Sequence, residues 1–130
     1  MDPVRRIIIV VWSCGPDRPG GAKLAAAPFV YGLAARALDL DVEMHFTSSA
    51  VRWLTDDAAA RAAWTDAAHT KTVRDFIVEA HAAGIRLFAC AMALHEHAPG
   101  AQPSAESAGI AGAATVMALA SQSDTRILTF

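Results

Sequence analysis

The stretch Arg6-Ile7-Ile8-Ile9-Val10-Val11-Trp12 decides the fold of this 130-residue chain. It is β-branched and apolar on both faces, which is typical of an interior strand in a parallel sheet covered by helices. The run is far shorter than the roughly 20 residues of a membrane-spanning helix. Arg5-Arg6 precedes the apolar run Ile7–Trp12, but Asp17-Arg18-Pro19 stands where a signal peptide would have its small-residue cleavage site. We therefore expect a buried first strand of a cytoplasmic protein.

Three further segments have the composition of strands. Asp41–Thr47 alternates between polar and apolar residues, as a strand with one wetter face does. Ile85–Cys90 and Arg126–Phe130 are short and mainly apolar, and they complete the set that the sequence predicts.

Helical spacing of apolar residues separates these strands. The i, i+3, i+4, i+7 pattern occurs at Val30, Leu33, Ala34 and Ala37, at Val73, Phe76, Ile77 and Ala80, and at Ala113, Val116, Met117 and Ala120. Gly84 is a natural stop for the second of these helices. A less regular helix is expected from Ala50 to Trp64, with Ser48 or Ser49 as its cap. Ala98–Ala108 is predicted to be the one long loop.

The order of these segments predicts the architecture. Strands that alternate with helices form parallel sheets with right-handed crossovers, so we expect a three-layer α/β/α sandwich. The sheet should be mainly parallel and contain four to five strands. The length is close to that of the commonest single domains, and no linker or internal repeat interrupts the chain, so residues 1–130 are expected to form one domain.

Composition excludes several classes of partner. The formal net charge is −2 and the basic residues are scattered singly, so we expect no nucleic-acid partner. We also expect no membrane partner. The two cysteines, Cys14 and Cys90, are too few for a disulfide scaffold and have no CxxC spacing, so both should be thiols in a reducing compartment. Gly20-Gly21 lacks the spacing of a dinucleotide or phosphate loop, and no cofactor is expected.

The reactive groups are expected at one edge of the sheet. The carboxyl ends of parallel strands share an edge, where ligands gather in open α/β sheets. Cys14 follows the first strand, Ser48 and Ser49 follow the second, and Cys90 ends the third. Ala91–Leu94 can begin a helical turn, whose free N–H groups would favour the thiolate of Cys90. The alternative is that Cys90 is only a small buried hydrophobic residue.

Other candidate neighbours lie further along the chain. His95 is a proton partner for the thiol or a solvated loop histidine. Together with Cys90 and His97 it could be imagined to bind a metal ion, but no fourth ligand is evident, and we expect no metal site. Gly109 and Gly112 precede a predicted helix, where they permit close approach of a ligand or a neighbouring subunit, or form only a tight turn.

Several of these stretches, taken together, resemble the DsrE/DsrF-like family. They are Ala27–Val30, Leu40–Thr47, the strand that ends in Cys90, Gly109–Ala114 and Asp124–Phe130, and they span nearly the whole chain. Members of the family include sulfur-relay subunits of dissimilatory sulfur oxidation and of tRNA thiolation. The resemblance implies a small, mainly parallel α/β domain that assembles into trimers or hexamers. It also implies that transferred sulfur is held as a persulfide on the cysteine that corresponds to Cys90.

The leading interpretation is an intracellular sulfur-relay protein, a persulfide carrier or sulfurtransferase in which Cys90 is the reacting residue. Its partners would be sulfur donor and acceptor proteins. Apolar surface on thin, alanine-rich helices also favours a homo-oligomer, a trimer or hexamer. The alternative is a non-catalytic module that binds a small ligand or another chain. A third interpretation is a redox sensor that pairs Cys14 with Cys90.

Overall fold

A five-stranded sheet lies at the centre of the computed structural model, which describes residues 2–130. Its strands are β1 (Arg6–Val11), β2 (Asp41–Phe46), β3 (Arg86–Cys90), β4 (Ser107–Ala111) and β5 (Thr125–Thr129). They lie in the order β4-β3-β2-β1-β5, and every neighbouring pair is parallel. The predicted α/β fold is confirmed, and β1 is an interior strand as expected.

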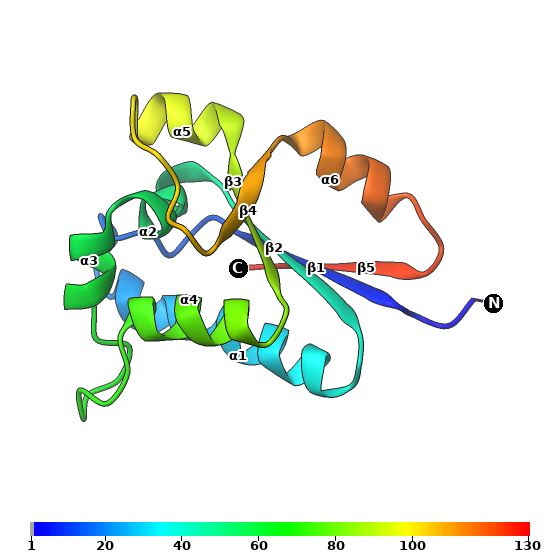
Figure 1. The fold of residues 1–130 in the computed structure, drawn as a ribbon, viewed down its shortest axis with the longest axis horizontal. Coiled ribbons are helices and arrows are strands. Elements are labelled where there is room, and N and C mark those ends of the chain that lie inside the picture. The colour runs from blue at the N-terminus through cyan, green and yellow to red at the C-terminus, as the bar shows by residue number, and fades with distance from the viewer. Residues whose placement is uncertain (1) are drawn as a thin grey trace.

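Helices lie on both sides of this sheet (Figure 1). On one side are α1 (Gly21–Ala37) and α4 (Val73–Ala82), and on the other are α5 (Ala91–His97) and α6 (Ala113–Ala120). The short helices η1 (Ser48–Val51), α2 (Arg52–Thr55) and α3 (Asp57–Ala62) follow β2. Among residues 2–130, none of these helices combines the length and the apolar character needed to cross a lipid bilayer.

The core fills the space between the sheet and the pair α1 and α4. The Phe29 ring of α1 lies 5.9 Å from the ring of Phe46 in β2 and 5.4 Å from the ring of Phe76 in α4. Phe29 and Phe46 are completely buried, and burying such a side chain contributes about 1.5–3 kcal/mol. This layer therefore covers one side of the sheet with a closely packed core.

The predicted buried face of α1 is wrong, whereas that of α4 is confirmed. In α1 the buried residues include Ala25, Phe29 and Gly32, and Val30 is exposed. A Cβ on Gly32 would lie 3.3 Å from Ile9 Cδ1, so the helix packs closely on β1. Because α1 is rich in alanine all round, its apolar pattern has too little contrast to identify the face that is buried.

Two other segments differ from expectation. The helix expected from Ala50 to Trp64 is divided at Asp56, whose side chain accepts a hydrogen bond from the Ala59 N–H at 3.0 Å and caps α3. Neither serine caps it, because Thr47 occupies the cap position of the preceding turn. The long loop predicted over Ala98–Ala108 ends earlier, since Ser107 begins the short edge strand β4. The small residues of β4 lack the β-branched pattern that would have predicted a strand.

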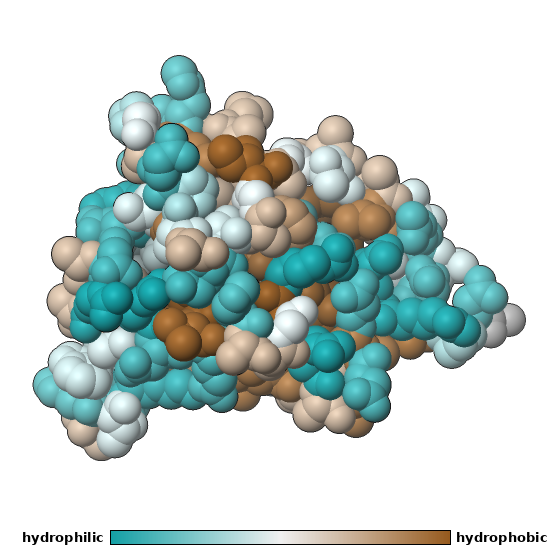
Figure 2. Space-filling view, viewed as in Figure 1, coloured by the Kyte–Doolittle hydropathy of each residue, from teal (hydrophilic) through white to brown (hydrophobic). Residues whose placement is uncertain are grey.

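The α6 side of the sheet is covered much less completely. Of the described residues of α6, none is buried, although the helix contains only alanines, one threonine and larger apolar side chains. Figure 2 shows apolar patches on this view of the molecule, near the end of α5 that meets β3 and along α6. We call the side of the sheet that carries α5 and α6 the open face of the domain.

Candidate functional site

A cavity of about 370 Å³ lies on the open face, between the sheet and α6. All five strands or their carboxyl ends contribute to its mainly apolar wall. The lining residues are Val10, His45, Thr47, Cys90, Ala111, Gly112, Ala113, Val116, Met117, Ile127 and Thr129. A parallel sheet brings these distant parts of the chain together because its strands all end at the same edge.

Cys90 occupies the position in this wall where β3 becomes α5. Its backbone is extended (φ −70°, ψ 128°), and it is the cap residue of the helix that begins at Ala91. In the sheet register it lies opposite Ala111, the last residue of β4. The predicted helical start after the thiol is therefore present. Cys90 is a free and partly buried thiol on an apolar cavity.

The structure adds Glu43 and His45, two residues that the sequence analysis did not single out. Both lie on β2, are only 4% and 5% exposed, and are joined by a contact of 3.0 Å between His45 Nε2 and Glu43 Oε1. The expectation that β2 has a wetter face is therefore wrong. The polar residues alternate because they form a buried network on the open face, and the end of this network at His45 lies on the cavity wall.

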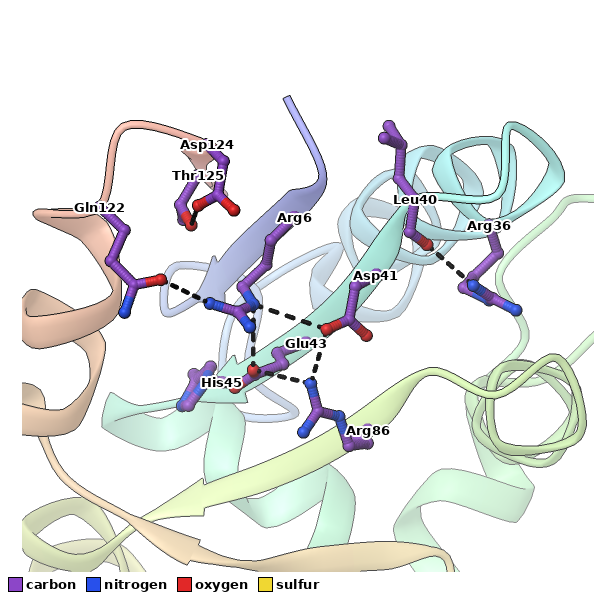
Figure 3. Close-up of polar contacts among 10 residues, drawn as sticks. All are labelled: Arg6, Arg36, Leu40, Asp41, Glu43, His45, Arg86, Gln122, Asp124 and Thr125. Atoms are coloured by element: carbon purple, nitrogen blue, oxygen red, sulfur yellow. Dashed lines mark hydrogen bonds and ion pairs between the residues drawn. The ribbon is translucent and has the colours of Figure 1, made fainter. Parts of the chain in front are cut away.

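Two arginines compensate the buried carboxylate of Glu43 (Figure 3). Arg86 Nη2 lies 3.0 Å from Glu43 Oε2 and 3.0 Å from Asp41 Oδ2. Arg6 Nε lies 3.5 Å from Asp41 Oδ2 and 3.9 Å from Glu43 Oε2. The strand register produces this cluster, because Arg6 pairs with Asp41 and Glu43 pairs with Arg86. Without such partners a buried carboxylate would cost several kcal/mol.

Of the predicted neighbours of Cys90, Gly112 lines the cavity. Gly109 lies within β4 at φ +153°, beside a shift in the β3–β4 register, and not on the cavity wall. Ser48 lines a separate depression with Met92 and other residues. His95 lies exposed on α5 rather than in a loop, and it is not among the residues that line the cavity.

Cys14 lies in the hydrophobic core rather than on the cavity wall. Its side chain is 1% exposed, and its carbonyl oxygen accepts a hydrogen bond from Trp53 Nε1. Burial raises the pKa of the Cys14 thiol to about 11, because the charged thiolate loses its hydration there. The two thiols thus occupy different environments, and both are free.

The metal interpretation of Cys90, His95 and His97 finds no geometric support. Within residues 2–130, no group of three or more histidine, cysteine or acidic side chains is arranged to hold a metal ion. His95 and His97 both lie on α5, where residues two positions apart point to different sides of the helix.

The fold and the site together define a class of small parallel α/β domains that present one thiol on an apolar cavity at the sheet edge. The chain belongs to the DsrE/DsrF-like family, whose model matches residues 10–130, and this confirms the resemblance seen in the sequence. The chain is also similar to the ychN protein of E. coli in its crystal structure. The TM-score is 0.73 over 98% of this chain and 100% of that chain, at 16% identity, which shows a common fold. No curated protein matches the sequence significantly.

Proposed function

We propose that this protein is a persulfide carrier of a sulfur relay, in which Cys90 accepts sulfane sulfur and passes it on. The observation that carries the proposal is the position of Cys90: it is the last residue of β3 and forms part of a cavity wall. Cys14, in contrast, is buried in the core. Membership of the DsrE/DsrF-like family is consistent with this role.

The reaction requires no net oxidation. The Cys90 thiolate attacks the outer sulfur of a donor persulfide, R–S–SH, and its electron pair forms the new S–S bond. The old S–S bond breaks, and its electron pair leaves with the donor as a thiolate, which takes up the proton lost by Cys90. An acceptor thiolate then removes the outer sulfur from Cys90 by the same step. Donor and acceptor proteins are accordingly the proposed partners.

The second candidate is a non-catalytic module that binds a small ligand or another chain. The mainly apolar lining of the cavity favours this alternative, because small-molecule sites are lined mainly by apolar side chains with a few polar groups among them. In that case Cys90 would serve only as one wall residue. The two candidates therefore differ in whether the thiol must react.

Mass spectrometry of the intact protein separates them. After incubation with glutathione persulfide, the wild-type chain should gain the mass of one sulfur atom, and Cys90→Ala should gain none. Cys14→Ser is the matched control and should still be loaded. Because cysteine and alanine differ little in volume, the free energy of unfolding of Cys90→Ala should lie within about 1.5 kcal/mol of the wild-type value. A wild-type chain that gains no sulfur, or Cys90→Ala that gains as much as wild type, would refute the carrier proposal.

A further inference from the structure

The buried pair Glu43 and His45 has no role in the reaction described so far. We propose that His45 is the proton acceptor for the Cys90 thiol and that Glu43 positions the His45 ring for this task. This inference rests on the proposed function, because it assigns the proton that Cys90 must lose. It follows from three features: the hydrogen bonds of Glu43, the packing of the His45 ring, and the shared cavity.

The hydrogen bonds of Glu43 determine which ring nitrogen of His45 can take a proton. Glu43 Oε2 accepts a hydrogen bond from Arg86 Nη2, whose guanidinium carries a permanent charge. Its Oε1 is then an acceptor, so Nε2 of His45 must donate across their 3.0 Å contact. Nδ1 is left with a free electron pair and can receive a proton. Carboxylates hold catalytic histidines in one tautomer in the same way.

Packing holds the His45 ring on the cavity wall. His45 pairs with Phe88 across β2 and β3, and their rings stack with centroids 4.9 Å apart and planes inclined by 16°. Cys90 lies two residues beyond Phe88 on the same face of β3, because alternate residues of a strand share a face. This register separates the Cα atoms of His45 and Cys90 by about 8 Å. Both residues line the one cavity.

The charged and titratable groups near His45 come from β1, β2 and β3. Glu43 is in contact with His45, and Arg6 and Arg86 form ion pairs with the other carboxylate oxygen of Glu43. Cys90 is the titratable residue that shares its cavity wall. The part of the wall that comes from α6 and β5 consists of alanine, valine, methionine, isoleucine and threonine, and none of these titrates near neutral pH. An imidazolium at His45 would thus be in contact with the Glu43 carboxylate and would share the cavity wall with a Cys90 thiolate.

The proton balance of the transfer follows directly. The Cys90 thiol gives its proton to Nδ1 of His45, which produces a thiolate and an imidazolium. The thiolate attacks the outer sulfur of the donor persulfide and expels the donor thiolate. The imidazolium then returns the proton to that leaving thiolate, so His45 ends neutral and the donor leaves as a thiol.

Alkylation of Cys90 by iodoacetamide, measured peptide by peptide at several pH values, tests this role without any sulfur donor. In His45→Gln the rate at about pH 7 should fall at least about tenfold, since the thiolate loses the imidazolium that stabilises it and a smaller fraction of Cys90 is ionised. At about pH 10 hydroxide supplies the base, and the variant should react as fast as wild type. His95→Gln, the same substitution at the exposed histidine of α5, should follow wild type throughout. Equal slowing at both pH values would show a packing role and overturn the proposal.

If His45→Gln does not fold, the proposal can be tested by NMR on two chains that keep His45, wild type and Cys90→Ser. The imidazole signal of His45, followed by NMR across a pH titration, should follow a different curve in Cys90→Ser than in wild type, because the serine forms no anion. Coincident curves would overturn the proposal. Neither experiment needs sulfur transfer, so failure of sulfur loading refutes the carrier function alone, whereas these results decide the role of His45.

Discussion

Trp53 Nε1 donates a hydrogen bond to the carbonyl oxygen of Cys14 at 2.7 Å, which anchors the end of β1 to the helix α2 that follows β2. Trp53 is itself 3% exposed, so this bond is shielded from water. The bond places Cys14 inside the core, although both cysteines lie where a strand ends, at the same edge of the sheet. Position at the carboxyl edge is therefore not sufficient to make a thiol accessible, and the environment of each side chain decides its chemistry.

Cys14 should be the slower thiol. Because burial raises its pKa to about 11, very little thiolate is present near neutral pH, and the reagent also has no access. Iodoacetamide at neutral pH should label Cys90 well before Cys14 in the native protein. Cys14→Ser should retain sulfur loading. Loss of loading in that variant, with an unchanged circular dichroism spectrum, would contradict this and favour the paired-thiol interpretation.

The same pKa shift predicts a loss of stability in alkali. The folded chain holds the Cys14 proton more tightly than the unfolded chain does, whose thiol titrates near its ordinary value of 9.0. The resulting stabilisation is complete below about pH 9 and is lost as the pH rises through about 11. It amounts to about 3 kcal/mol. Urea denaturation measures the free energy of unfolding of wild type and of Cys14→Ala. From about pH 9 to about pH 11, the wild-type value should fall relative to that of Cys14→Ala by this amount. A constant difference would contradict the shift.

The sequence predicted most of the framework because interior strands and contrasted helices have strong patterns. The runs around Ile8 and Leu87 are apolar and short. In α4 the buried apolar residues lie on one face of the helix, and the charged residues lie on the others. It also predicted that Cys90 ends a strand before a helix. These are local properties, since neighbouring residues in the chain determine them.

The polar half of the site could not be predicted in this way. Glu43 and His45 look like the wet face of a strand until Arg6 and Arg86 are placed beside them, and those arginines belong to other strands. Only the register of the parallel sheet shows that the charges are paired and that His45 reaches the cavity. A histidine two residues after a glutamate in a predicted interior strand was the available signal.

The two glycines around β4 should respond differently to substitution by alanine. Gly109 has φ +153°, a conformation that residues with a side chain rarely adopt, so Gly109→Ala should destabilise the fold by about 1–3 kcal/mol. Gly112 has an extended backbone and open space around its Cα, so Gly112→Ala should lie within about 0.5 kcal/mol of wild type. Thermal unfolding of both variants checks this, and equal effects would contradict it.

Assembly is the prediction that the open face supports most directly. Two methionines on the helices of this face are highly exposed: Met92 of α5 at 82% and Met117 of α6 at 64%. Isolated domains rarely leave such side chains grouped in water, so we expect self-association into a trimer or hexamer. Multi-angle light scattering at micromolar concentration measures the mass of the assembly directly.

A matched pair of variants identifies the surface that associates. Met117→Glu places a charge on α6, where burial against another copy would leave it unpaired, so this variant should yield a smaller species. Val78→Glu places the same charge on α4, on the opposite side of the sheet, where Val78 is also exposed. It should assemble like wild type, because the charge at Val78 would remain in water, outside the proposed interface. A monomeric wild-type chain, or dissociation by Val78→Glu and not by Met117→Glu, would contradict an interface on α6.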